Sequence, residues 1–434
     1  MTKKHMILKR KLKQTGRKLS KMFTNTLQIR EFAKVKGGKR LPKGNFVLDE
    51  KTNHPYLRVS DMRSDGLDLS DIKYISDEVY KQIKRYTVTH DDVYISIAGT
   101  IGFVGKIPRH LSGANLTENA AKITDLDKKL IDQDYLVYFL RSREGQFKIK
   151  SKTGGSSQPK LAITRTEKIE IPKIPVDQQS KIAAIINNYT NLIENNEKRI
   201  KILEEMVQRL YLNKIVNASN KNWDSEHIKD LLESHVGGGW GSENQSDKYT
   251  TQAYVIRGTD IPSAKNGDIA SIPLRFHPES NLKSRKLEVG DIVFEVSGGS
   301  PNQPLGRALL ITEEFLDSFG GSVICASFCK RVVPKKDKLI PEILYLSFLE
   351  AQKNGEIHSF EIRSTGISNF KWTDYINSIT RTTPPKDIQI EFQNFVKPLF
   401  AEIALLGRRN FKLQEIRDLL IPQLVTGRKT IKNV

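Results

Sequence analysis

The sequence has little cysteine and no long hydrophobic run. Its 434 residues include two cysteines, Cys325 and Cys329, too few for the disulfide framework of a small secreted domain. Both lie in SVICASFCKRVV, which is typical of one buried strand, and four residues along a strand span about 13 Å, too far for a disulfide. A C-x3-C pair without a second cluster is a poor zinc motif. We interpret both cysteines as core residues in a reducing cytoplasm and predict a cytoplasmic protein.

Catalytic motifs are missing as well. GGSPNQPLGR (residues 298–307) lacks the lysine and the spacing of a phosphate-binding loop, and no G-x-G-x-x-G motif follows a predicted strand. TPPK (residues 383–386) lacks the polar and aromatic residues of a base-methylation motif. The eight histidines show no metal-ligand spacing. The sequence therefore predicts no catalytic residue, no metal site and no cofactor in this chain, and no apolar run approaches the ~18 residues that a membrane helix needs.

Positive charge is abundant. The formal net charge is +20 and the isoelectric point is near 9.6, which favours a polyanionic partner, with nucleic acid first. Residues 1–30 hold ten Lys and Arg and no acidic residue. Residues 1–26 are expected to form a basic tail, which is either simply solvated or contacts DNA phosphates. A targeting peptide is disfavoured because no apolar core of ~7–15 residues follows.

The stretch 175–216 predicts one long helix. Apolar residues recur every 3.5 positions for four heptads, a spacing typical of a coiled-coil seam rather than of a helix in a globular core. Pro175 and Asp177 favour a helix start. The seam positions are Ile182, Ile186, Tyr189, Ile193, Asn196, Ile200, Leu203, Val207 and Leu210.

The second half of the chain repeats the first. LRVSDM (residues 57–62) corresponds to IRGTDI (residues 256–261), and Asp92 corresponds to Asp291, both at an offset of 199. Nearer the long helix the offset becomes 210, so that Gln179 corresponds to Gln389. Two constant offsets with one change of length indicate a duplicated unit with a loop insertion.

The repeat predicts a second long helix over residues 385–427. Its seam carries Asn410 and the one charged residue Arg417. We expect it to pair with the first helix as an antiparallel coiled coil, which would place a globular domain at each end of a rod. The expected fold class is α/β (α+β), with a pseudo-two-fold internal repeat. Two mixed α/β domains, 27–174 and 224–384, alternate with the two helices.

Four loops suit DNA contact, because small and polar residues let backbone amides and forked side chains approach phosphates and base edges. They are residues 96–102, 152–160, 296–307 and 361–372. For any single candidate, an ordinary solvated loop residue is the alternative interpretation. The candidate DNA-binding residues are Arg58, Ser96, Thr100, Ser157, Gln158, Lys160, Arg257, Ser297, Asn302, Gln303, Arg363, Asn369 and Lys371.

Several motifs together resemble one known family. A GTIG turn, a GGSSQPKL loop and I-P-x-I-P-V-D-Q-Q-x-K-I-A opening a long helix are similar to the specificity subunit of type I restriction–modification systems. SGGSPNQPLGR, TGISNFKW and RDLLIPQLVTG add to the resemblance, which covers residues 27–430. The long basic tail departs from the family pattern.

The resemblance implies a non-catalytic subunit that gives a DNA-modifying complex its sequence specificity. Each target-recognition domain would read one half of a split double-stranded DNA site, and the helix pair would set the gap. Two modification subunits, using S-adenosylmethionine, would dock on the helices, and restriction subunits would use ATP and Mg²⁺. The expected docking residues are Gln178, Asn195, Lys198, Glu205 and Arg209.

Two other classes of function remain open from the sequence. A free-standing DNA-binding regulator or scaffold would bind its site without partner subunits. A nuclease is disfavoured because the sequence shows no acidic metal cluster.

Overall fold

A computed structural model describes residues 25–155, 159–218, 223–298, 305–364, 367–429 and 431. It divides into two compact units: unit 1 runs to Thr190 and resumes at Glu415, and unit 2 comprises Asn191–Gln414. Most of the predicted basic tail, residues 1–24, lies outside the described residues. Within the described ranges, no helix combines the length and the apolar character needed to cross a membrane.

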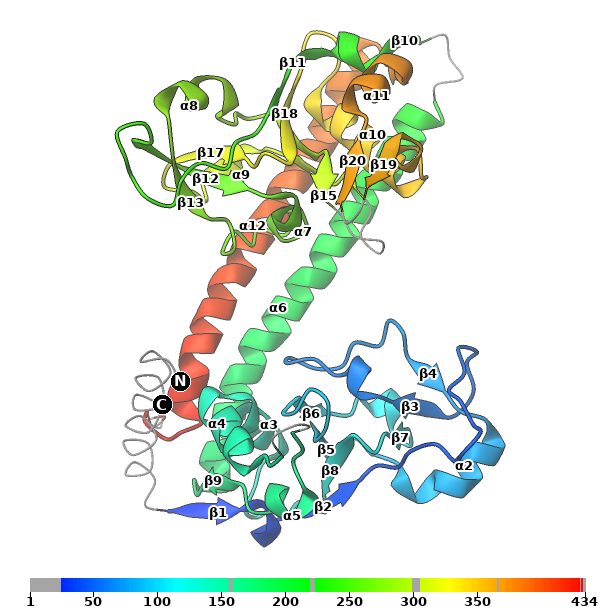
Figure 1. The fold of residues 1–434 in the computed structure, drawn as a ribbon, viewed down its shortest axis with the longest axis vertical. Helices are drawn as coiled ribbons and strands as arrows, with labels where there is room; N and C mark the ends of the chain where they lie inside the picture. Colours follow the sequence, from blue (N-terminus) through cyan, green and yellow to red (C-terminus); the bar gives the residue numbers. More distant parts are fainter. Residues whose placement is uncertain are drawn as a thin grey trace. The chain divides into compact units, whose positions relative to one another are not determined.

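Unit 1 contains a four-stranded sheet and a three-stranded sheet (Figure 1). One of the two inner strands of the larger sheet, β5 (Val93–Ser96), is buried along its whole length because its residues VYIS face core on both sides. A separate pair, β1 (Thr26–Gln28) with β9 (Glu170–Pro172), precedes the long helix. The larger sheet has the order β2 (Lys34–Gly37), β8 (Ala120–Thr124), β5 (Val93–Ser96), β6 (Val104–Lys106), and the smaller has β4 (Lys73–Tyr74), β3 (Pro55–Leu57), β7 (Asn115–Leu116).

Unit 2 repeats this topology for both sheets and for the strand pair, and it contains one further three-stranded sheet. Its pair is β10 (Asp224–His227) with β21 (Thr380–Thr383). In both smaller sheets the outer pairings are one antiparallel and one parallel. The larger sheet has the order β11 (Leu232–Gly237), β18 (Cys329–Pro334), β14 (Ile292–Glu295), β16 (Ala308–Leu310), and the smaller has β13 (Leu274–His277), β12 (Thr251–Ile256), β17 (Ser322–Cys325).

Short helices cover these sheets. In unit 1, α3 (Gln133–Arg141) begins where the Asp132 carboxylate accepts a hydrogen bond from the backbone N–H of Tyr135 at 3.0 Å. In unit 2, α10 begins with Pro341, whose fixed φ suits a first helical turn. The helices are α2 (Asp77–Ile83), α3 (Gln133–Arg141), α4 (Arg143–Lys152), α5 (Ile163–Thr166), α7 (Ile261–Lys265), α8 (Glu279–Arg285), α9 (Glu313–Leu316), α10 (Pro341–Lys353) and α11 (Trp372–Ser378).

The two predicted long helices are present. α6 spans Val176–Tyr211 and continues as a π-helical turn, Leu212–Val216, while α12 spans Lys386–Leu424. Each starts directly after a proline whose carbonyl accepts the fourth N–H of the helix, at 3.0 Å in both. Each globular core includes the start of one long helix and the end of the other: Ile182 with Leu424 in unit 1, and Phe392 with Val207 in unit 2.

α6 and α12 pair antiparallel within unit 2, which confirms the predicted coiled coil. Arg199 contacts Glu402 at 2.9 Å and Lys214 contacts Glu391 at 2.5 Å, so that residue numbers rise along α6 as they fall along α12. Ile200, Ile403 and Leu406 form a buried part of the seam beside the Arg199–Glu402 contact. The seam positions predicted from the heptad spacing in α6 are buried or half-buried, against the partner helix in the middle of α6 and against the globular cores toward its ends.

The cysteine region differs from the prediction. SVICASFCKRVV is two strands, because Cys325 ends β17, Cys329 begins β18, and a turn closes between them with the N–H of Cys329 donating to the carbonyl of Ala326 at 2.8 Å. The two strands belong to different sheets, so the strand-length argument against a disulfide does not apply. Both thiols are nevertheless free and fully buried, and burial raises the pKa of Cys325 to about 12.

The repeat preserves a framework of buried polar contacts. Oδ2 of Asp92 pairs with Nζ of Lys122 at 3.2 Å in unit 1, and Oδ2 of Asp291 pairs with Nε of Arg331 at 2.7 Å in unit 2. Both carboxylates also accept a backbone N–H three residues upstream. Buried charges need such partners because desolvation is costly.

A buried glutamine anchors each long helix in the same way. In unit 1, the Gln179 amide accepts the N–H of Asp132 at 2.9 Å and donates to the carbonyls of Leu130 and Ile174. In unit 2, the Gln389 amide accepts the N–H of Ile340 at 3.0 Å and donates to two carbonyls. Both glutamines are 1% exposed, so these bonds replace all contact with water.

Candidate nucleic-acid interface

In unit 1 the two predicted DNA-binding loops lie side by side. An antiparallel bridge joins Ala98 of the GTIG loop to Lys160, and the N–H of Leu161 donates to the carbonyl of Ile97 at 2.9 Å. The segment after α4 is therefore fixed against the segment after β5.

Unit 2 brings its two loops together at the equivalent place. β15 (Ser297–Gly298) pairs with β20 (Ile367–Phe370), placing Ser297 opposite Asn369, and the N–H of Phe370 donates to the carbonyl of Val296 at 2.9 Å. β20 also pairs with β19 (Glu361–Ser364). The segment that the sequence indicated as a loop is thus partly a hairpin, because its alternating residues complete a small three-stranded sheet.

The predicted DNA-binding residues fall into three groups. Thr100, Lys160, Asn369 and Lys371 are exposed, and half-buried Ser297 donates its hydroxyl hydrogen to Oδ1 of Asn369 at 2.7 Å. These five could contact DNA in their present positions. Ser157, Gln158, Asn302 and Gln303 lie outside the described residues, as does the side chain of Arg363, whose backbone belongs to β19.

Ser96 is a correction. Its side chain is fully buried, and its hydroxyl accepts the N–H of Phe103 at 2.8 Å, which closes the GTIG loop from inside. Its place as the last residue of a buried strand explains why its side chain holds the shape of the loop and is not exposed for DNA contact.

The paired arginines of the repeat have intramolecular partners. Arg58 contacts Asp61 through Nε at 3.3 Å and through Nη2 at 2.7 Å, and Arg257 contacts Asp260 through the same atoms at 2.9 and 2.7 Å. Each aspartate also accepts the backbone N–H of its arginine, so that each pair closes a 3-10 turn. The structure thus gives both arginines a role in holding the turn after β3 and β12.

Two exposed residues near these loops were missed by the sequence analysis. Nε of Arg40 contacts Oε1 of Glu118 at 2.7 Å, and this hydrogen bond raises the pKa of the guanidinium. Trp240, at the equivalent position of unit 2, has the Arg275 guanidinium 4.5 Å from its ring centroid. The aligned glycine pairs in KGGKR and VGGGW were the available signal.

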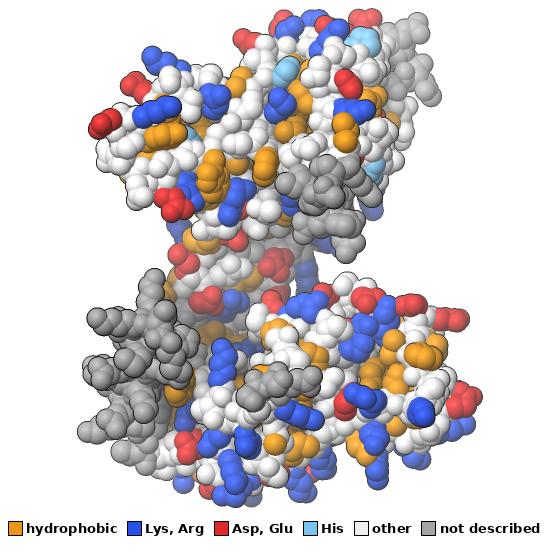
Figure 2. All heavy atoms as spheres, in the orientation of Figure 1, with side chains coloured by type: hydrophobic (Ala, Val, Ile, Leu, Met, Phe, Trp, Pro, Cys, Tyr) orange, Lys and Arg blue, Asp and Glu red, His pale blue; other side chains and the backbone are white. Residues whose placement is uncertain are grey.

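Basic charge is distributed over both units. On the face drawn in Figure 2, Lys and Arg side chains occur over much of each unit, interspersed with Asp and Glu. This pattern supplies phosphate contacts over a broad surface, while base contacts must come from particular loops.

The predicted docking residues are accessible. Asn195, Lys198, Glu205 and Arg209 are exposed on α6, and Gln178 is half-buried near its start. The prediction missed the apolar side chains among them, since Leu192, Ile202 and Met206 are 51%, 55% and 46% exposed. Apolar residues off the seam were the sequence signal for this surface.

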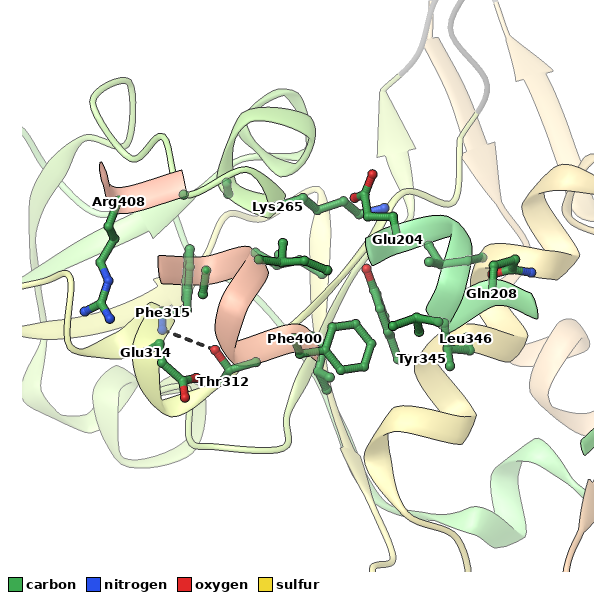
Figure 3. A pocket seen from close by; sticks show the side chains of 18 of the residues that line it. Glu204, Gln208, Lys265, Thr312, Glu314, Phe315, Tyr345, Leu346, Phe400 and Arg408 are labelled. Atoms are coloured by element: carbon green, nitrogen blue, oxygen red, sulfur yellow. Dashed lines mark hydrogen bonds between the residues drawn. The ribbon is translucent and has the colours of Figure 1, made fainter. Parts of the chain in front are cut away.

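A cleft of about 340 Å³ lies within unit 2 where both long helices meet the globular core (Figure 3). Phe400 and Tyr345 line it edge to face, with ring centroids 5.9 Å apart, and Glu204 and Lys265 approach each other at its rim. Burial lowers the pKa of Lys265, which Glu204 partly offsets. The lining is mostly apolar and suits an apolar side chain better than a charged ligand.

The described parts of the chain contain no candidate metal site. Among those residues, no three His, Cys, Asp or Glu side chains come together to hold an ion.

Comparisons with known proteins show which proteins this chain is similar to. Residues 24–205 match the type I restriction modification DNA specificity domain. Two specificity subunits from Methanocaldococcus jannaschii are similar: that of the type I enzyme MjaIX is 22% identical over 83% of this chain and 82% of its own length, and that of MjaVIII is 22% identical over 94% and 93%. The crystal structure of a type I specificity subunit from M. genitalium shares the fold, with a TM-score of 0.57, 14% identity, and coverage of 94% of this chain and 96% of that one.

Fold and loops thus define a duplicated protein with one recognition-domain topology used twice. Residues 24–205 carry the type I restriction modification DNA specificity domain, and the chain is similar to type I specificity subunits over most of its length, which confirms the resemblance seen in the sequence.

Proposed function

We propose that this chain selects the DNA sequence for a type I restriction–modification complex, with each unit reading one half of a bipartite site. One observation carries the proposal: the two units share every framework strand, yet their exposed loops carry different side chains. A shared framework presents two loop sets in the same way, and different side chains would read different half-sites.

The helix pair would set the distance between the half-sites. A packed antiparallel seam with a buried polar contact resists slipping, so its length is a fixed property of the chain. The gap in the DNA site would then follow from the number of heptads.

Modification subunits would dock on the exposed face of α6 in unit 2. This face carries both apolar and charged side chains, as the core and rim of a protein interface do. The cleft beside Phe400 could accept one apolar side chain of the partner as an anchor. S-adenosylmethionine would belong to those subunits, and ATP and Mg²⁺ to the restriction subunits. In this proposal the chain itself performs no catalysis.

The test is a domain exchange in the assembled complex. Residues 27–174 are replaced by the matching domain of another specificity subunit, the complex is expressed with its modification subunits, and methylated sites are mapped by sequencing. One half-site is expected to change while the other half and the spacer stay the same. If both halves change, or neither does, the proposal is wrong.

A gel-shift series separates this function from a free-standing regulator. The chain alone is expected to bind DNA weakly and without sequence preference, and to become specific when modification subunits are added. Tight, specific binding by the chain alone would favour the regulator.

A further inference from the structure

A short turn in each unit joins the smaller sheet to the larger one. Residues 117–119 link β7 to β8, and residues 326–328 link β17 to β18. The carbonyl of Asn119 accepts the N–H groups of Ile97 and Ala98 at 2.8 and 3.1 Å. The carbonyl of Phe328 accepts those of Val296 and Ser297 at 2.9 and 3.2 Å. Each turn is therefore bound directly to the loop expected to contact DNA.

The other side of the turn is fixed by a glycine. A Cβ at Gly38 would lie 2.2 Å from the carbonyl oxygen of Thr117, and one at Gly238 would lie 2.2 Å from that of Ala326. No side chain fits at such distances, so only glycine allows this approach. Two residues later the chain reaches Arg40 in unit 1 and Trp240 in unit 2. In each unit the turn thus lies between this segment and the predicted loops.

The exposed side chains at these equivalent positions differ between the units. Unit 1 presents Glu118, paired with Arg40, and exposed Asn119. Unit 2 presents Phe328 and Trp240, which are 55% and 40% exposed. Single exposed apolar residues are ordinary, but Phe328 lies on the turn that is bound to the predicted loop, and Trp240 follows the segment packed against the same turn. Moreover, Trp240 is held by Arg275, which is itself paired with Glu243 at 2.7 Å.

We propose that this turn is a specificity-determining element of each unit, with Phe328 contacting a thymine methyl group in one half-site and Asn119 contacting adenine in the other. Apolar side chains recognise the C5-methyl of thymine in the major groove, and the carboxamide of asparagine matches the donor and acceptor of adenine. The framework strands have the same topology in both units, so we expect differences in reading to come from exposed positions such as these. The inference rests on the proposed function.

The test uses the full chain in complex with its modification subunits. The site is first defined by mapping methylation by the unaltered complex, and binding is then measured on oligonucleotides carrying uracil in place of each thymine, which removes only the methyl group. Phe328→Ala is expected to weaken binding roughly 10- to 200-fold, the range for one apolar contact of methylene size. One uracil substitution in the half-site of unit 2 should weaken the unaltered complex by a similar factor. It should add no further loss in the variant.

Matched variants complete the experiment. Val289→Ala removes a side chain that is 48% exposed at the opposite end of β14, and it should leave binding unchanged. Asn119→Ala should reduce discrimination at one adenine of the other half-site alone. Thermal unfolding should be unaltered in all three variants, because each replaced side chain is exposed.

Two failures can be told apart. If the unaltered complex methylates no defined bipartite site, the proposed function fails and the inference falls with it. The inference alone is wrong if the unaltered complex is specific but the Phe328→Ala complex binds every oligonucleotide as well as the unaltered complex does. It is also wrong if the half-site of unit 2 holds no thymine whose methyl group affects binding.

Discussion

Nδ2 of Asn196 donates a hydrogen bond to Oδ1 of Asn410 at 2.8 Å, and Asn410 in turn donates to the carbonyl of Ile193 at 3.2 Å. Both asparagines are buried, at 8% and 6% exposure, in a seam otherwise made largely of apolar side chains. The contact forms in one register only, since a shift along either helix would leave two amides unpaired. Polar seam pairs fix register in this way at some cost in stability.

Replacing one member of this pair should cost more than replacing both. Asn196→Leu leaves the buried Oδ1 of Asn410 without its donor, and should lower the free energy of unfolding by about 1–3 kcal/mol. The double variant Asn196→Leu/Asn410→Leu should recover most of the loss. Urea unfolding of the four proteins measures the coupling, and strictly additive losses would contradict the prediction. The exposed neighbour Asn195→Leu is the control and should change stability by less than about 0.5 kcal/mol.

The two glutamine anchors should act independently. Gln179→Ala and Gln389→Ala each remove a buried amide that bonds three backbone groups, and each should cost about 1–3 kcal/mol of stability. Each acts within a different unit, so the losses in the double variant should add. Chemical denaturation provides the measurement. Gln178→Ala, half-buried beside the first anchor, should have little effect on stability, and an equally large loss there would argue against the anchors.

Gly407→Ala should destabilise unit 2 although alanine favours helices. A Cβ at this position of α12 would lie 2.1 Å from the carbonyl oxygen of Asn266, so helix and loop would have to separate. We expect overpacking to outweigh the ~1 kcal/mol gain in helix propensity and to leave a net loss of about 1–3 kcal/mol. Gly320→Ala is the matched control, because no atom would lie within 4 Å of its Cβ. A more stable Gly407→Ala protein, measured by thermal unfolding, would show that the contact gives way easily.

Buried His277 should make stability depend on pH. The residue is 0% exposed, and neither ring nitrogen has a hydrogen-bond partner among the described residues. Burial and then the charge of Arg285 lower its pKa from the usual 6.5. The folded state thus binds fewer protons than the unfolded state, so stability is complete above about pH 6.5 and falls as the pH drops toward the folded pKa.

Replacing this histidine should reduce that slope. His277→Gln should lose less stability than the unaltered protein between pH 7.5 and 5, in urea unfolding at each pH, even if it is less stable throughout. The exposed His227→Gln should keep the original slope. An unchanged slope in His277→Gln would assign the pH dependence to other groups.

Lengthening the helix pair should lengthen the DNA spacer. One heptad inserted into α6 after Ile200 and one into α12 after Ile403 keeps the seam in register and adds about 10 Å, or about three base pairs of DNA. Methylation mapping should then find both half-sites unchanged and the gap altered. Inserting four residues in place of seven rotates the seam residues away from the partner helix, so this variant serves as the control. It is expected to lose methylation activity. An unaltered gap after the heptad insertion would contradict a spacing role for the helices.

The heptad pattern and the internal repeat were readable because both depend on local spacing. Apolar residues every 3.5 positions locate α6 to within a few residues, and the offsets of 199 and 210 match strands that the structure superposes in topology. Composition and loop chemistry were less informative about the site. Ser96 has the composition of a DNA-contacting loop but lies at the buried end of β5, and Arg58 has the charge of a phosphate ligand but is paired with Asp61.

The sequence by itself determined the duplicated architecture, the two long helices and the absence of recognisable catalytic motifs, since periodicity, repetition and motif spacing are properties of neighbours along the chain. Only the tertiary structure decided that Asn196 meets Asn410, and that a turn at residues 326–328 carries Phe328 beside the predicted loops. These contacts join residues far apart in the chain. Their geometry depends on how closely two backbones approach, as at Gly38 and Gly238, and no local pattern encodes that distance.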